Sequence, residues 1–243
     1  MTDDRSPAWG PVPRTRAHEL VVQAIEDQIM SGALRVGDPL PPERELASRL
    51  EVSRAGVREA VRVLEGQGVL RARVGAGADA GTFVAALPDG ALTRFLRLHV
   101  ALANFPYADV IDARVILERS SARLAALHAD EAGIAAIRAT LETGADASLG
   151  HAAYNDADTA FHVAIAEASG NRLVASMTVA IRESLSARIL VALQDYEGWE
   201  ELVATLHQQH LELLDAIERH DADAAEELAE RHIRFAETAL TSA

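Results

Sequence analysis

The chain has 243 residues, 49% of them hydrophobic, which is enough for one large globular domain or two of ordinary size. It has no cysteine, no run of about 20 apolar residues and no apolar leader near its start, which excludes disulfide bonds and a membrane-spanning helix and leads us to expect a cytoplasmic protein. Its formal net charge of −14 argues against a nucleic-acid partner only if the charge is evenly spread. It is not, since residues 1–87 carry −1, residues 88–243 carry −13, and residues 32–76 hold eight arginines against six acidic residues.

The N-terminal third of the sequence predicts an arm followed by three helices. Residues 1–16 are polar and contain three prolines, so we expect a mobile arm. From 17 to 32, apolar residues recur at helical spacing. A short second helix over 43–50 follows Pro42, a residue well suited to open a helix, and a third helix is predicted over about 54–67. Three helices in this arrangement are typical of a helix-turn-helix.

Two short extended runs come next, and everything after them is helical. Residues 69–73 and 81–85 flank several glycines and predict a β-hairpin, which would be the wing of a winged helix-turn-helix. The turn-rich stretch 86–90 is a linker. Beyond residue 91, short breaks separate six or seven amphipathic helices, a pattern that predicts an antiparallel all-α bundle. We therefore expect a mainly α protein with a DNA-binding domain over 17–85 and a helical domain over 91–243.

The predicted third helix has two different faces. Val57, Val61 and Leu64 form an apolar stripe that would pack on the first two helices, whereas arginines and small residues lie at its N-terminal end. That end is where a recognition helix meets base edges and phosphates. The residues expected to contact DNA, with one on the second helix and one on the wing, are Arg44, Ser53, Arg54, Ala55, Gly56, Arg58 and Arg73. The alternative is that these arginines form an ordinary solvated surface.

The same segment resembles the GntR family of regulators. The resemblance lies in the run from Gly37 to Ala47, in Leu50 to Arg54, and in a set of matching positions between Val57 and Leu70, and it covers residues 17–85. It implies that Arg44, Ser53, Arg54, Ala55, Gly56 and Arg58 occupy DNA-contacting positions. The wing tip over 74–81 is longer and more acidic than the short glycine-containing tip of the family.

A second pattern predicts a metal site in the helical domain. Asp158 and His162 are four residues apart, which places a carboxylate and an imidazole on one face of a helix. His210 and His232 each lie 11 residues from Asp221, at a predicted turn between two antiparallel helices, so inward-facing imidazoles would meet across the hairpin. Three imidazoles and one carboxylate suit a divalent transition metal. Zinc is the first candidate, with nickel, manganese, cobalt or iron as alternatives.

Residues 91–240 resemble the FCD ligand-binding domain of the FadR-type branch of these regulators. Matching pieces include Arg114-x-x-Leu117-Glu118, Asp158-x-x-Phe161-His162 and Gly170-Asn171. The resemblance implies that Asp158, His162, His210 and His232 are the metal ligands. His207, one turn before His210, is a possible substitute that the family pattern does not favour.

The resemblance also implies a small carboxylate effector, such as a hydroxy acid, a sugar acid or a dicarboxylate. Arg114 is the first candidate to bind it, because a buried arginine needs an anion. The alternative is an internal pair with Glu118, four residues on. Weaker candidates for lining the effector cavity are Asn171, Arg182 and Ser186.

Together these features predict a ligand-responsive transcription regulator, in our interpretation a repressor and not an enzyme. We expect a homodimer on a near-palindromic operator, because a single recognition helix reads few base pairs, and no membrane partner. Three alternatives stay open. The metal itself could be the signal, it could only stabilise the bundle, or, least favoured, the three histidines and the carboxylate could serve a metal-dependent enzyme.

Overall fold

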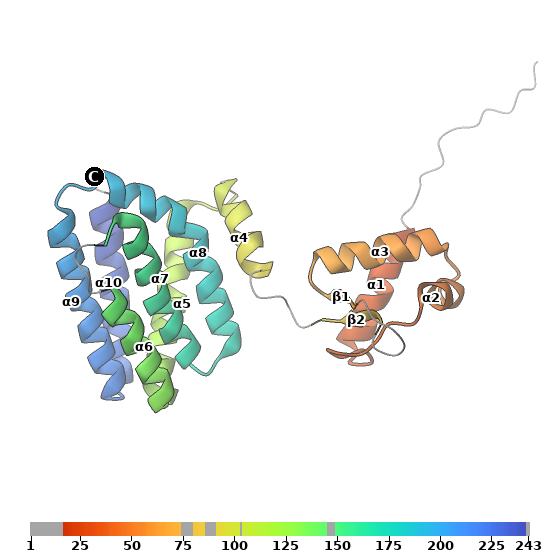
Figure 1. The fold of residues 1–243 in the computed structure, drawn as a ribbon, viewed down its shortest axis with the longest axis horizontal. Coiled ribbons are helices and arrows are strands. Elements are labelled where there is room, and N and C mark those ends of the chain that lie inside the picture. The colour runs from red at the N-terminus through yellow and green to blue at the C-terminus, as the bar shows by residue number, and fades with distance from the viewer. Residues whose placement is uncertain (1–16, 74–79, 86–90, 103, 145–148, 242–243) are drawn as a thin grey trace, which may run out of the picture. The chain divides into compact units, whose positions relative to one another are not determined.

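The computed structural model describes residues 17–73, 80–85, 91–102, 104–144 and 149–241. It divides into two compact units, Met1–Ala91 and Leu92–Ala243 (Figure 1). The predicted arm over 1–16, the linker over 86–90 and most of the predicted wing tip lie outside the described residues.

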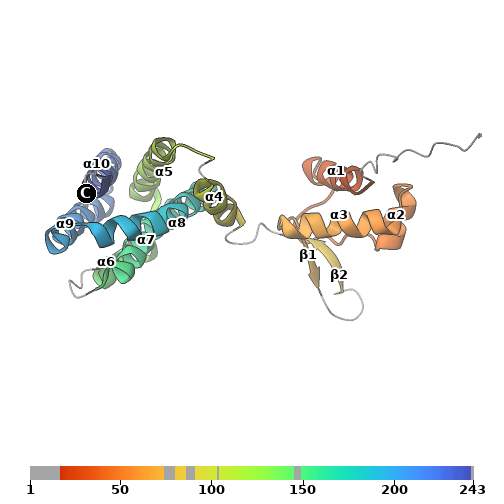
Figure 2. The same cartoon turned by 90° about the horizontal axis from the view of Figure 1, so that it is seen from above.

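The N-terminal unit is a winged helix-turn-helix. Its elements are α1 (Ala17–Met30), α2 (Glu43–Arg49), α3 (Arg54–Gly66), β1 (Leu70–Arg73) and β2 (Gly81–Val84). The two strands pair antiparallel, in register from Leu70 opposite Val84 to Arg73 opposite Gly81 (Figure 2). The backbone before α2 runs beside β2, since Leu40 N donates to Thr82 O at 2.8 Å. This bond joins the wing to the segment before α2, in addition to its connection along the chain to α3.

The core of this unit follows the predicted apolar stripes. Val57 and Leu64 of α3 are fully buried against Val21 and Ile25 of α1. Ser53 caps α3, because its Oγ accepts a hydrogen bond from the backbone N of Gly56 at 3.1 Å. The stripe therefore turns the N-terminal end of α3 and its arginines toward the outside.

The C-terminal unit is the predicted helical bundle. Seven helices follow the wing within the described residues: α4 (Ala91–Ala101), α5 (Tyr107–His128), α6 (Glu131–Gly144), α7 (His151–Ala168), α8 (Arg172–Asp195), α9 (Trp199–Glu218) and α10 (Ala222–Thr241). Helix α5 contacts α7, α8, α9 and α10 (Figures 1 and 2). The predicted fold class is thereby confirmed. None of the described helices is long and apolar enough to cross a membrane.

The bundle has a polar centre between apolar clusters. One cluster gathers residues such as Phe161, Leu213 and Ile217 from α7 and α9, and a second forms around Tyr154 and Leu202. Between them lie six buried charged or titratable side chains, and a buried group of this kind needs partners. They are Arg114, Glu118, His162, Arg182, His210 and His232.

Candidate DNA-contact helix and metal centre

The predicted DNA-contacting residues of the helix-turn-helix lie on its exposed side. Arg54, Ala55 and Arg58 on α3 are exposed, as are Ser53 before it and Arg44 on α2. The hydroxyl of Ser53 already accepts the capping bond from Gly56, so its own proton is left to donate. The unit thus presents its arginines where a duplex could reach them.

Two of these arginines have partners inside the unit. The guanidinium of Arg58 donates to the carboxylate of Glu43, with Nη2 3.0 Å from Oε2. Arg73 lies over the ring of Phe83, with its guanidinium carbon 4.6 Å from the ring centroid. The first pair joins α2 to α3, and the second lies on the wing.

Gly56 has a packing role that the sequence did not reveal. It is half-buried, and a Cβ placed on it would lie 3.3 Å from the Cβ of Ala17. Its lack of a side chain therefore serves the close approach of α1 to α3. A contact between Gly56 and DNA stays a prediction.

The four predicted metal ligands come together in the bundle. Asp158 and His162 lie on α7, His210 on α9 and His232 on α10. Each offers one ligand atom, and these atoms all lie within 4.8 Å of one another. The three histidines are buried, and Nε2 of His232 lies 3.2 Å from Nε2 of both His162 and His210. The equal spacing of His210 and His232 from the α9–α10 turn does bring the two imidazoles together, with ring centroids 4.4 Å apart.

Two acceptors determine how two of the imidazoles are oriented. Nδ1 of His162 lies 2.7 Å from Oε2 of Glu118, and Nδ1 of His232 lies 2.9 Å from Oε1 of Gln209. A carboxylate and an amide oxygen only accept hydrogen bonds, so each Nδ1 must carry the proton. Each Nε2 then directs a lone pair toward the centre of the cluster.

The charges around the cluster are balanced by buried ion pairs. Arg182 Nη1 donates to both oxygens of Glu118, at 2.8 and 2.6 Å, and Nη2 donates to Oδ2 of Asp158. Arg114 Nε donates to Oε1 of Glu118 at 2.7 Å. Burial by itself raises the pKa of Glu118, but Arg182, His162 and Arg114 more than reverse this, so the pKa lies well below its usual range.

His162, His232 and Asp158 are in the protonation states that bind metals. Burial, reinforced by the charge of Arg182, lowers the pKa of His162 to about 4. Burial also lowers the pKa of His232 well below its usual value, and His210 and His162 act in the same direction. For Asp158, burial raises the pKa, but Arg182 and the bond to His210 lower it well below its usual range. Neutral imidazoles beside an ionised carboxylate are the forms that coordinate a divalent ion.

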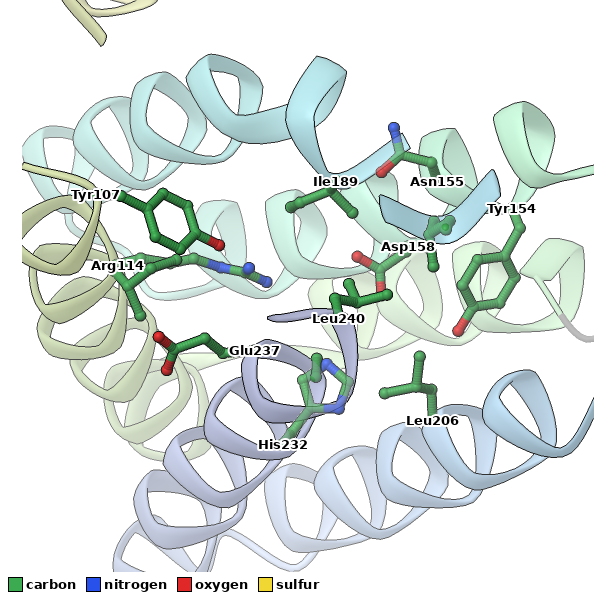
Figure 3. A pocket seen from close by; sticks show the side chains of 13 residues that line it. Tyr107, Arg114, Tyr154, Asn155, Asp158, Ile189, Leu206, His232, Glu237 and Leu240 are labelled. Atoms are coloured by element: carbon green, nitrogen blue, oxygen red, sulfur yellow. The ribbon is translucent and has the colours of Figure 1, made fainter. Parts of the chain in front are cut away.

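A cavity adjoins this cluster. Its free volume is about 30 Å³, room for little more than a water molecule. Asp158 and His232 form part of its wall, Tyr107 and Arg114 lie to one side, and Tyr154 lies to the other (Figure 3). The sides are closed by apolar residues of α8, α9 and α10 such as Ile189, Leu206 and Leu240.

The four predicted effector residues occupy different places. Arg114 lines the cavity, whereas Arg182 is engaged with Glu118 and Asp158 and is absent from the cavity wall. Ser186 acts through a neighbour, because its Oγ lies 2.8 Å from Nδ2 of Asn155, which does line the cavity. Asn171 lies away from the wall, where its side-chain oxygen caps α8 by accepting from the N–H groups of Leu173 and Val174. In this structure Asn171 is thus a helix cap.

Several residues of the site escaped the sequence analysis. Glu118 was considered only as a partner of Arg114, and Gln209, Tyr154, Asn155 and Tyr107 were not singled out. Uncharged residues in amphipathic helices carry no distinctive signal of a site. The neighbours of His162 and His232 could have been sought only after the bundle topology was known.

Comparisons with known proteins agree with both units. Residues 17–79 match the gntR family of bacterial regulatory proteins, and residues 109–235 match the FCD domain. The chain is 32% identical to the HTH-type transcriptional repressor NanR of Escherichia coli K12, over 96% of this chain and 90% of that protein. It is also 32% identical to NanR of Edwardsiella tarda, over 92% of this chain and 85% of that protein. Among solved structures, Streptococcus agalactiae GntR aligns with a TM-score of 0.54 and 25% identity, over 90% of this chain and 98% of that chain.

Proposed function

The chain belongs to the GntR family of bacterial regulatory proteins and carries an FCD domain, and we propose that it is a repressor controlled by a small carboxylate bound beside a metal ion. As a member of this family it is a transcription regulator, and the relatives named above are regulators rather than enzymes. DNA is therefore its partner through the winged helix-turn-helix. The metal, the effector and the dimer are the parts that we propose.

The strongest support for a bound metal is the contact between two of the imidazoles. Nε2 of His162 and Nε2 of His232 are 3.2 Å apart, and the contacts of the two Nδ1 atoms leave no proton to lie between them. Two lone pairs that face each other inside a protein repel unless a cation joins them. His210 and Asp158 each add one ligand atom to the same group, whose atoms all lie within 4.8 Å of one another. The donor set, three imidazoles and one carboxylate, fits zinc first, and nickel, cobalt, iron or manganese also accept it.

The effector is argued from the cavity that shares a wall with this cluster. Four protein ligands fill the tetrahedral sphere that zinc usually adopts, so an acidic group would bind by expanding it to five ligands, or at a position left open by a metal of higher coordination number. Arg114 lies on the same wall and offers a positive charge to a carboxylate. With only about 30 Å³ free, an organic acid can enter only if side chains or helices move. Binding would therefore shift side chains or helices of the bundle as well as fill the cavity.

Packing connects this cavity to α4, the helix that follows the DNA-binding unit along the chain. Tyr107 and Ile111 line the cavity, and both pack in a cluster that includes Val100 of α4. Along the chain, α4 is the first helix after the segment that joins the two units. We propose that effector binding moves α4 and so alters how the two DNA-binding units of a homodimer engage the half-sites of a near-palindromic operator.

Metal analysis and a ligand screen test the proposal. Wild-type protein loaded with zinc and freed of excess should hold about one metal ion per chain by elemental analysis, and His162→Ala or His232→Ala should remove most of it. His207→Ala is the matched control, because His207 lies on α9 one turn before His210 but outside the cluster. Full metal retention in both cluster variants would contradict the site.

A thermal-shift screen of hydroxy acids, sugar acids and dicarboxylates on the metal-loaded protein would then identify the effector class. Arg114→Ala should abolish the shift, whereas Arg119→Ala, on the same helix but paired with Glu226 and Glu230, should keep it. Metal-dependent DNA binding without any acid would favour a metal sensor. A change in stability alone on chelation would favour a structural ion.

A further inference from the structure

Glu118, which is not one of the four candidate metal ligands, is a buried side chain with several bonded partners. Glu118 on α5 is 3% exposed, and its two carboxylate oxygens receive bonds from three different residues. Arg114 Nε donates to Oε1, Arg182 Nη1 donates to both oxygens, and His162 Nδ1 lies 2.7 Å from Oε2. A buried carboxylate with this many partners holds each of them in one orientation.

We propose that Glu118 is the positioning residue of the candidate metal centre, which orients two of its four ligands, His162 directly and Asp158 through Arg182. The inference rests on the proposed metal site and adds a residue that contacts no metal. Glu118 holds the ligand side chains in place before any ion arrives, so that metal binding costs less of their conformational entropy.

The direct contact acts on His162. Its imidazole can carry its proton on either nitrogen, and only the form with the proton on Nδ1 offers Nε2 as a ligand. The Oε2 atom of Glu118 accepts that proton in a hydrogen bond and so selects the form that binds a metal. Without this acceptor, Nε2 could take the proton and donate it to the nearby His232 or Asp158, and the site would be blocked.

The indirect contact acts on Asp158. Arg182 forms a bridge, with Nη1 on Glu118 and Nη2 on Oδ2 of Asp158. Its Nε is buried without a hydrogen-bond partner among the described residues, so these two carboxylates account for its position. With Oδ2 occupied by Arg182, Oδ1 is the atom that faces the histidines, 3.3 Å from Nε2 of His210. The carboxylate of Glu118 on α5 thereby holds His162 of α7 and Arg182 of α8 in position.

The test separates orientation from simple stability. In metal-free wild-type protein labelled with ¹⁵N, long-range correlation spectra of the imidazoles should show His162 with its proton on Nδ1. His162→Gln would identify its signals among the nine histidines. Glu118→Gln keeps the side-chain volume but replaces the acceptor-only carboxylate with an amide. It should produce a mixture of the two protonated forms of His162, a change that a loss of stability alone would not cause.

Zinc affinity is the second measurement, made by competition with a chelator. Glu118→Gln should weaken zinc binding by about 10- to 100-fold. The matched control is Glu226→Gln. Glu226 lies on α10 outside the cluster, and its carboxylate pairs with Arg119 of α5. This variant should bind zinc as the wild type does.

Two results would overturn the inference: a wild-type His162 with its proton on Nε2, or zinc affinity in Glu118→Gln equal to that of the Glu226→Gln control. A wild-type chain that binds no zinc at all would instead overturn the metal site. The spectra of the metal-free protein need no bound ion, so they report on the Glu118–His162 contact in either case.

Discussion

The guanidinium of Arg58, at the start of the recognition helix, lies 3.0 Å from the carboxylate of Glu43 on the preceding helix. Arg58 is a predicted phosphate or base contact, and both side chains are partly exposed. A DNA phosphate bound by Arg58 would therefore have to compete with Glu43 for the same guanidinium.

Glu43→Gln should strengthen binding to DNA of any sequence. Removing the competing charge frees Arg58 and reduces repulsion of phosphate, so we expect several-fold tighter binding and a steeper loss of affinity with salt, by about one unit of slope. Fluorescence anisotropy with a random-sequence duplex over a range of KCl concentrations measures both. Glu45→Gln is the control, because Glu45 pairs with Arg49 instead. Equal behaviour of the two variants would show that Glu43 does not restrain Arg58.

Arg54→Ala should weaken binding to a specific operator. Arg54 is the first residue of α3 and is exposed where a recognition helix meets the major groove. We expect a loss of about 1–3 kcal/mol, measured by titration of an operator that the wild-type protein selects from a random library. Arg62→Ala, farther along the same helix, controls for the loss of one positive charge. If both variants bind the operator as the wild type does, α3 is not the reading helix.

The order and boundaries of the helices could be predicted from the sequence, since they depend on local signals. Apolar residues at helical spacing marked α1 and α3, and Pro42 marked the start of α2. The neighbouring sequence could not predict which distant residues pack against a small residue. Gly56 was grouped with the predicted DNA contacts, and its packing against Ala17 was not foreseen, because that contact joins residues 39 positions apart.

The candidate metal site shows the same division. Its four residues followed from the spacing of Asp158 and His162 and from the symmetry of His210 and His232 about a turn. The groups that orient them did not, because Glu118 and Gln209 approach from the other side of each ring. Both contacts depend on how the helices of the bundle rotate about their axes, and a single sequence does not specify that rotation.

Tyr154→Phe should stabilise the protein while weakening effector binding. The hydroxyl of Tyr154 is buried at the wall of the cavity without a hydrogen-bond partner among the described residues. Burying an unpaired hydroxyl costs about 1–3 kcal/mol, so its removal should raise the free energy of unfolding by about 1 kcal/mol. Urea unfolding measures this in the absence of any acid.

An acid found in the thermal-shift screen provides the second half of that experiment. If its polar groups bond the hydroxyl of Tyr154, the phenylalanine variant should bind it more weakly. Tyr196→Phe is the control, because Tyr196 packs against the same apolar cluster but does not line the cavity. A Tyr154→Phe variant that is less stable than the wild type would mean that the hydroxyl has a partner after all.

The metal-free protein should lose stability as the pH falls from about 6.5 toward 4. Burial lowers the pKa of His162 to about 4 in the folded chain, whereas in the unfolded chain it is about 6.5. Between these values the unfolded chain binds a proton that the folded chain does not, so acid favours unfolding. His162 alone should lower the free energy of unfolding by about 2 kcal/mol between pH 7.5 and pH 5. His232, whose pKa is lowered by the same cause, acts in the same direction.

Urea unfolding in a chelator-containing buffer at several pH values measures this dependence. Asp158 and Glu118 do not contribute above pH 5, because their lowered pKa values confine their effect to the region near and below pH 4. His162→Gln should make the curve between pH 7.5 and 5 less steep and leave the part due to His232. His207→Gln should leave most of the curve, since His207 lies outside the cluster. If wild-type stability stayed constant over that interval, the pKa of His162 would not be lowered in the folded chain, which would contradict its burial among the other candidate ligands.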